Sequence, residues 1–170
     1  MKAKIQYVDP AEIDDGKGLD ELLVAVNRSA AVVKGGRRFS FSALSIVGNR
    51  EGIVGYGFGK ARQVPMAVEK AAKDGRKHLQ QFARTPWGSI PHEVTGEHCG
   101  AIVRLIPASD GTGIIAGASV RAVAEMGGVR NLLSKAYGST NPINLVKATL
   151  HALSQLRSPE EVAALRGVEL

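Results

Sequence analysis

A glycine pair between two runs of strand-forming residues is the feature that most restricts how this chain can fold. The segment VVKGGRRFSF, residues 32 to 41, places Gly35 and Gly36 between the runs Ala30–Lys34 and Arg37–Val47. Glycine adopts positive φ at little steric cost, so such a pair favours the tight turn of a β-hairpin. The second run first alternates Phe with Ser and then becomes apolar at successive positions, which indicates a bulge or a strand end buried on both faces.

This hairpin turn carries more positive charge than a turn requires, because Lys34, Arg37 and Arg38 flank its glycines. Residues 28 to 84 hold twelve Lys or Arg against three acidic residues, a net charge of +9, whereas residues 85 to 170 balance at zero. A basic segment of this kind favours contact with the phosphates of a nucleic acid. Solubility alone is the plainer alternative.

Two other elements are expected next to the hairpin. Leu19, Leu22, Leu23 and Val26 fall at the i, i+3, i+4 and i+7 spacing of an amphipathic helix. The segment IVGYGFGK, residues 53 to 60, predicts a third strand whose glycines recur at every second position. A strand face made of glycine is flat and allows another backbone to approach closely.

The basic segment is expected to end in a helix that begins near Pro65, packs with one face and presents cations on the other. The apolar side comprises Val68, Ala72, Gly75, Leu79 and Phe82, and the cationic side comprises Lys70, Lys73, Lys77 and Arg84. The predicted order is therefore helix, three antiparallel strands, helix.

The rest of the chain predicts a second unit of mixed strands and helices. TPWGSIP, residues 85 to 91, has the composition of a linker, and residues 92 to 109 predict two strands broken near Gly100. A glycine-rich loop then leads into a helix that ends at Gly127 and Gly128. Two further helices are expected, one with Asn141 as N-cap and Pro142 as first residue, and one opened by a Ser158–Glu161 capping box and ending near Gly167.

No arrangement of residues in the sequence predicts catalysis or a metal site. The four histidines lie in unrelated contexts, and no serine lies in a nucleophile-elbow pattern. Cys99 has His98 beside it but no second ligand pair, so a half-buried thiol is expected. We therefore expect neither an enzyme nor a cofactor.

Two glycine-rich segments resemble nucleotide loops without meeting their requirements. GYGFGK has Val54 and Ala61 where a Walker motif needs glycine and Ser or Thr, so Lys60 and Arg62 are interpreted as phosphate contacts or as solvated cations. DGTGIIAG, residues 110 to 117, could bind an anion at a helix N-terminus, but no Lys or Arg occurs between Arg104 and Arg121. A tight turn that lets the helix dock closely is the favoured interpretation.

The second strand of the hairpin carries two aromatic residues. Phe39 and Phe41 could stack on bases, but their strand spacing favours a place in the core.

A single cysteine fits a reducing compartment, and no apolar run reaches the length a bilayer requires. A cytoplasmic protein with no membrane partner is expected.

Four stretches of the chain closely resemble the bacterial small-subunit ribosomal protein S-five family. They are VNRSAAVVKGGRRFSFSALSIVGN, GIVGYGFGKARQVPMAVEKA, PASDGTGIIAGASVRAVAEMGGVRNLLSKAYGSTNPINLVKAT and SPEEVAALRG. The resemblance covers about residues 19 to 167 and is most specific at KAYGSTNPIN. It implies an α+β chain of two small α/β domains, the first like double-stranded-RNA-binding domains and the second an α/β sandwich.

The resemblance also implies partners and contact residues. The implied partners are 16S ribosomal RNA, the neighbouring proteins S-four and S-eight, and messenger RNA at the entry channel, with an influence on translational accuracy. The implied RNA-contacting residues are Asn27, Arg28, Lys34, Gly35, Gly36, Arg37 and Arg38, to which the charge pattern adds Lys60, Arg62, Lys70, Lys73 and Lys77. The implied contact with S-four comprises Gly111, Thr112, Gly113, Gly117 and Arg121.

The expected domains are residues 19–84 for ribosomal RNA and 92–170 for ribosomal proteins, joined by 85–91. Residues 1–18 contain the acidic stretch DPAEIDDG, which matches no motif of the family and is interpreted as an arm. Two alternatives remain at this point. One is a phosphotransfer enzyme that uses DGTGIIAG, since the family's second domain shares its fold with certain kinases, and the other is a free RNA-binding regulator.

Overall fold

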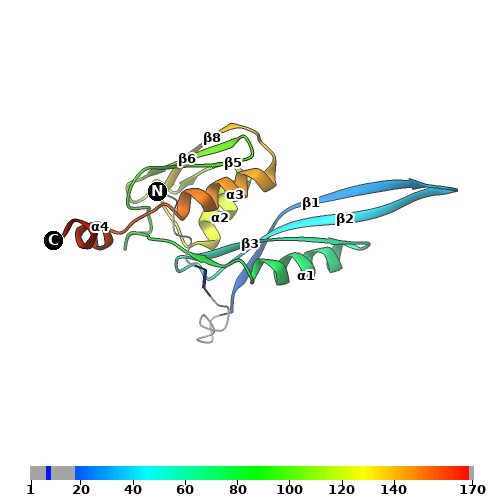
Figure 1. Cartoon of the computed structure of the whole chain (residues 1–170), viewed down its shortest axis with the longest axis horizontal. Coiled ribbons are helices and arrows are strands. Elements are labelled where there is room, and N and C mark those ends of the chain that lie inside the picture. The colour runs from blue at the N-terminus through cyan, green and yellow to red at the C-terminus, as the bar shows by residue number, and fades with distance from the viewer. Residues whose placement is uncertain (1–6, 9–17, 169–170) are drawn as a thin grey trace.

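Two four-stranded sheets and four helices make up the described part of the chain, residues 7–8 and 18–168 of a computed structural model (Figure 1). The first sheet is antiparallel throughout, in the order β1 (Asp20–Val33), β2 (Gly36–Gly48), β3 (Ile53–Ala61) and β4 (Gln80–Gln81). The second has the order β5 (Val94–His98), β6 (Ala101–Pro107), β8 (Leu132–Gly138) and β7 (Ile114–Ile115), with β7 and β8 parallel. The helices are α1 (Val64–Gly75), α2 (Ala118–Met126), α3 (Pro142–Leu153) and α4 (Pro159–Arg166).

The sheets and helices are stacked in layers that share one core. Helix α1 covers one face of the first sheet, and α2 packs on the other face, while α3 lies on β5 and β6 (Figure 1). Side chains from both halves of the chain form a single buried cluster, including Ile46 of β2, Val123 of α2 and Leu150 of α3. The predicted two α/β units are therefore present, and α2 and α3 fill the space between their sheets.

The predicted helix at residues 19 to 26 is wrong, because residues 20 to 26 form the first part of β1. A bulge lies between Leu23 and Ala25, where the register to β2 shifts by one residue. Leu23 pairs with Ser45 and Val26 pairs with Ala43, so these two apolar side chains lie on the same face although they are three positions apart. The bulge thus produces a spacing that resembles that of a helix.

Burial of β2 on both faces agrees with the prediction. Leu44 and Ile46 belong to the core shared with α2, and Val47 faces the other way, toward Gly75 of α1. All three side chains are at most 2 % exposed. The inner half of β2 is therefore a central strand buried by a helix on each side.

The glycine face of β3 is in direct contact with the backbone of α1. A Cβ on Gly57 would lie 1.9 Å from the carbonyl oxygen of Ala71, and one on Gly59 would lie 2.2 Å from that of Ala67. Both alanines are fully buried. The expectation that these glycines allow a close backbone approach is confirmed.

Helix α1 is shorter than the sequence pattern predicted. It ends at Gly75, so Leu79 and Phe82 are buried from the segment that follows it and not from its apolar face. Lys70 and Lys73 lie on the helix, whereas Lys77 and Arg84 lie beyond its end. Of the predicted cationic face, only Lys70 and Lys73 are therefore part of the helix.

The predicted strands and caps of the second half are confirmed, although β7 and β8 were not foreseen. Asn141 caps α3 through a 3.3 Å hydrogen bond from the backbone N–H of Ile143. Ser158 and Glu161 form the expected capping box of α4, which ends at Gly167 in the left-handed conformation. Cys99 is exposed at the β5–β6 turn with φ 46°, so the predicted half-burial of its thiol is wrong.

Residues 85 to 91 form a tight turn that packs against the second sheet. Ser89 is 1 % exposed, and its hydroxyl donates to the carbonyl of Asn131 at 2.9 Å and accepts from the backbone N–H of Ala108 at 3.2 Å. Trp87 at the tip of this turn is 62 % exposed.

Of the expected arm at residues 1–18, only Tyr7, Val8 and Gly18 are described. The backbone N–H of Val8 donates to the carbonyl of Leu79.

Replacement of Gly57 by Ala tests the contact between β3 and α1. The added methyl group would collide with the helix backbone, so we expect Gly57→Ala to lower the free energy of unfolding by about 1–3 kcal/mol or more, measured by urea titration. Gly36→Ala is the matched control, because no atom lies within 4 Å of its would-be Cβ, and a change of at most about 0.5 kcal/mol is expected. Equal urea midpoints for the two variants would contradict this packing.

Candidate nucleic-acid interface

The β1–β2 hairpin closes with a two-residue turn made by Lys34 and Gly35. Val33 pairs with Gly36, and Gly35 has φ 89°, whereas Gly36 is the first residue of β2 and does not have positive φ. Only one glycine of the pair is therefore required by the backbone conformation of the turn. No atom lies within 4 Å of a Cβ built on either glycine, so the backbone of the tip is open to a ligand.

The outer part of this hairpin projects away from the rest of the molecule. Every residue from 26 to 39 is exposed, and Val32 is 82 % exposed. Figure 1 shows the ribbon of β1 and β2 extending past the N-terminal end of α1. Because this part is exposed along its length among the described residues, its side chains contribute little to the core and are free to contact a partner.

The strand register places arginines on both faces of the ribbon. Arg28, Arg37 and Phe39 lie on the face that turns toward α1 further along the sheet. Arg38 lies on the opposite face, together with Asn27. A polyanion that wraps the tip can therefore meet positive charge on either side.

Arg28 and Phe39 form a stacked pair on the α1 side of the ribbon. The guanidinium carbon of Arg28 lies 3.6 Å from the centre of the Phe39 ring and 5.9 Å from that of Phe41. Phe39 is 40 % exposed, so the prediction that it belongs to the core is wrong, whereas Phe41 is half-buried against Ala43, Ala67 and Ala71. The cation–π contact holds the guanidinium plane in place at the surface.

Serine hydroxyls tie the strands together at the base of the ribbon. The hydroxyl of Ser29 donates to the carbonyl of Ser40 at 3.2 Å, and that of Ser40 donates to the carbonyl of Ala61 at 3.2 Å. These bonds link β1, β2 and β3 just below the protruding part. They fix the direction in which the ribbon leaves the sheet.

All twelve sequence-predicted RNA-contacting residues are exposed, and none of the cationic ones makes an ion pair with a described residue. Lys60 is the last residue but one of β3, Arg62 follows the strand, and Lys70 and Lys73 lie on α1. By contrast Arg76, beyond α1, is bound to Glu21 at 2.9 Å. Lys60 pairs with Ser42 and lies on the face of the sheet opposite α1, whereas Lys70 and Lys73 lie on α1 and Lys77 beyond it. The unpaired cations are therefore distributed over both sides of the first half of the chain.

The loop Asp110–Gly113 is organised by a buried asparagine that the sequence analysis did not identify. The Asn131 side chain is bonded to Asp110 at 3.1 Å and accepts from the N–H of Gly113 at 3.0 Å. Gly111 and Gly113 have φ 85° and 73°, and space for a Cβ is open at both. The glycines therefore serve the turn conformation, and the expected close docking of the helix is not their role.

The sequence-predicted protein-contacting residues form one surface at the start of α2. Gly117 precedes the helix and its carbonyl accepts from the N–H of Arg121 at 2.8 Å. Thr112 is half-buried, whereas Arg121 and the neighbouring Ile115 are exposed, Ile115 at 55 %. This surface mixes apolar and cationic groups, which is typical of a protein contact.

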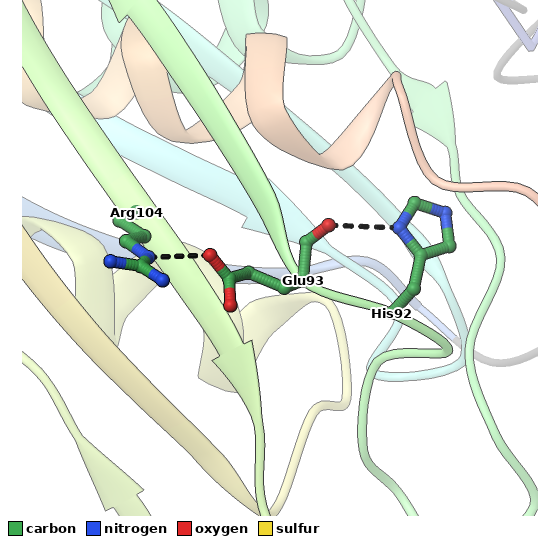
Figure 2. A network of polar contacts seen from close by, with 3 residues as sticks. All are labelled: His92, Glu93 and Arg104. Atoms are coloured by element: carbon green, nitrogen blue, oxygen red, sulfur yellow. Dashed lines mark hydrogen bonds and ion pairs between the residues drawn. The ribbon is translucent and has the colours of Figure 1, made fainter.

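A surface network holds the start of the second sheet (Figure 2). Nε of Arg104 donates to the Glu93 carboxylate at 2.5 Å, and this bond lowers the pKa of Glu93 below its ordinary value. His92 Nδ1 lies 3.0 Å from the Glu93 carbonyl, and its Nε2 accepts from the N–H of Arg157 at 3.2 Å. An imidazole with its hydrogen on Nδ1 can make both hydrogen bonds, because Nδ1 then donates and Nε2 accepts.

Neither a metal cluster nor a membrane-spanning helix occurs within residues 7–8 and 18–168. No group of three or more His, Cys, Asp or Glu side chains comes together there, and no helix is long and apolar enough to cross a bilayer. A protruding ribbon carries cations that have no ion-pair partner among the described residues, and two packed α/β units support it. This arrangement is typical of the class of basic proteins that bind polyanions.

Comparison with known sequences gives the family. The profile of the ribosomal protein S5 N-terminal domain matches residues 19–83, and that of the ribosomal protein S5 C-terminal domain matches residues 96–166. The small ribosomal subunit protein uS5 of Psychromonas ingrahamii is 52 % identical over 161 residues, which cover 94 % of this chain and 96 % of the relative. That of Shewanella amazonensis is 55 % identical over 152 residues, covering 89 % and 90 %. The chain belongs to the ribosomal protein S5 family.

The Glu93–Arg104 bond predicts a small pH dependence of stability. Because the folded-state pKa of Glu93 is lowered, its contribution is present above its unfolded value near 4.5 and is lost as the pH falls through the folded pKa. We expect the urea midpoint of Glu93→Gln to fall less than that of the parent protein when the pH is lowered below 4.5. Glu97→Gln is the control, since its carboxylate has no ion pair with a described residue, and an equal effect in both variants would contradict the assignment.

Proposed function

We propose that this chain binds ribosomal RNA through the β1–β2 hairpin and meets neighbouring ribosomal proteins through its second half. As a member of the S5 family it is a structural component of the small ribosomal subunit in the cytoplasm, and it is not an enzyme. The observation that carries the proposal is the protruding ribbon, whose tip presents Lys34, Arg37 and Arg38 without an ion-pair partner among the described residues.

The physical basis of RNA binding is the release of counterions when these cations meet phosphates. The N–H groups around Gly35 add donors that a phosphate oxygen can reach, because the space at the turn is open. Lys60, Arg62, Lys70 and Lys73 extend the contact along the first sheet and α1. Residues 19–84 are thus proposed as the domain that binds 16S ribosomal RNA, near the neck of the subunit.

Residues 92–170 are proposed to contact ribosomal proteins. The family resemblance supports a contact of Gly111, Thr112, Gly113, Gly117 and Arg121 with protein S-four and of other surface of this half with S-eight. Its mixture of exposed Ile115 and Arg121 suits such a contact. An influence on translational accuracy and a place beside messenger RNA at the entry channel complete the proposal.

The salt dependence of RNA binding tests the hairpin. Each of the variants Lys34→Ala, Arg37→Ala and Arg38→Ala is expected to lower the slope of log K against log salt concentration by about one, because one phosphate contact is lost. Binding to transcribed small-subunit ribosomal RNA is measured by filter retention from low to moderate salt. Arg166→Ala is the control, since α4 lies at the opposite end of the molecule from the hairpin (Figure 1). Unchanged slopes in all three hairpin variants would overturn the assignment.

The Arg28–Phe39 pair predicts a contribution to RNA-binding affinity that does not depend on salt concentration. Stacking of an unpaired base on an aromatic or guanidinium plane is worth about 1–3 kcal/mol, so Phe39→Leu is expected to weaken binding by about fivefold or more at fixed salt. The slope against salt concentration is expected to remain that of the parent protein, because no charge is removed. Phe58→Leu is the matched control, with a phenyl ring of similar exposure outside the hairpin. An equal loss of affinity in both variants would argue against stacking.

A further inference from the structure

A second concentration of positive charge lies far from the hairpin tip, where the two halves of the chain meet. A hollow of about 480 Å³ is lined by four arginines, which we call the arginine pocket. The arginines are Arg50, Arg84, Arg121 and Arg130, and the other lining residues are Ile114, Glu125, Gly128 and Val129.

The arginine pocket is assembled from segments that are distant in the sequence. Arg50 lies in the β2–β3 turn, Arg84 follows β4, Arg121 lies on α2 and Arg130 precedes β8. Backbone hydrogen bonds fix this junction, since the N–H groups of Arg50 and Gly52 donate to the carbonyls of Met126 and Gly127 at 2.9 and 3.0 Å. The walls of the pocket are therefore held together by the fold and do not depend on a ligand.

Two of the arginine side chains lie directly over glycines. A Cβ on Gly88 would be 3.1 Å from Cβ and Cγ of Arg130, and a Cβ on Gly52 would be 3.8 Å from Cδ and Nε of Arg84. Each side chain thus lies close to the backbone of a glycine, where a larger residue would leave less room for it. This proximity restricts the positions that the charged groups can take.

The positive charges of the pocket are mostly uncompensated. Arg50 is bound to Asp20 at 2.8 Å, which leaves further N–H donors of its guanidinium group available. Arg84, Arg121 and Arg130 form no ion pair with a described residue, and Glu125 is the one carboxylate lining the pocket. Four like charges around one hollow repel one another, so a multiply charged anion would relieve the repulsion.

We propose that the arginine pocket is a phosphate-binding site, separate from the hairpin. Guanidinium groups match phosphate oxygens with paired hydrogen bonds, and several such groups in one hollow suit a ligand with several negative charges. A single carboxylate carries one charge and would leave most of the arginines unpaired. The phosphates come either from an RNA backbone or from a free phosphorylated molecule.

The site differs from both surfaces already assigned. It shares Arg121 with the proposed protein contact and shares no residue with the hairpin. The absence of basic residues between Arg104 and Arg121 in the sequence argued against an anion site near DGTGIIAG, but the fold brings Arg50, Arg84 and Arg130 to its side.

Binding of inorganic tripolyphosphate to the full chain tests the site. Isothermal titration at low salt is expected to give one principal site, weakened about tenfold or more in Arg84→Gln/Arg130→Gln and unchanged in Arg166→Gln, which removes charge on α4. The triple variant Lys34→Ala/Arg37→Ala/Arg38→Ala is expected to keep this site, which separates the inference from the proposed role of the hairpin. Thermal unfolding of each variant verifies folding. Equal binding by the double variant and the parent protein would overturn the proposal.

A tethered hydroxyl-radical source in the assembled small subunit distinguishes the origin of the phosphates. The reagent is attached at Glu125→Cys in a Cys99→Ser background, because Cys99 is exposed. Cleavage of ribosomal RNA around the tether supports an RNA backbone in the pocket. Absence of cleavage together with tripolyphosphate binding by the subunit supports a free phosphorylated ligand. Absence of both would mean that a protein segment fills the pocket, and would overturn the proposal.

Discussion

Close contact between the backbone of α1 and the glycine face of β3 is the constraint on which the first half of the molecule depends. With Gly57 and Gly59 under Ala71 and Ala67, the backbone of the helix lies directly on the backbone of β3. A second helix meets the second sheet in the same way, since a Cβ on Gly96 would lie 2.2 Å from the carbonyl oxygen of Ala148. Such thin interfaces leave the larger apolar side chains for the space between the sheets, where α2 and α3 join both halves into one core.

Much of the fold could be predicted from local patterns, and the failures have local causes. The hairpin, the flat third strand and the helix caps were correct because each depends on a few neighbouring residues with strong conformational preferences. The first helix was wrong because a bulge between Leu23 and Ala25 gives a strand the i, i+3 spacing of a helix. The strand β8 was missed because the segment Leu132–Gly138 alternates little between apolar and polar residues.

The candidate sites also differ in how far they could be predicted from neighbouring residues in the sequence. The cations of the hairpin are adjacent in sequence, so their clustering could be predicted, whereas Arg50 and Arg130 come together only when the β2–β3 turn docks on the end of α2. Asn131 could not be recognised as the organiser of the Asp110 loop, since nothing in a single sequence distinguishes it from a surface asparagine. The exposure of Phe39 follows from the length of the ribbon beyond α1, which strand periodicity does not report.

The protruding ribbon has a consequence for how the chain can vary in evolution. A two-stranded hairpin without a packed face gains little stability of its own, and its outer residues add almost nothing to the shared core. Substitutions there are therefore nearly invisible to selection for folding, and only the partner that covers the tip can constrain them. The inner half of β2, from Ala43 to Gly48, is buried, and packing in the core restricts which residues can replace those present. One continuous pair of strands thus carries two separate selective pressures that meet near Phe41.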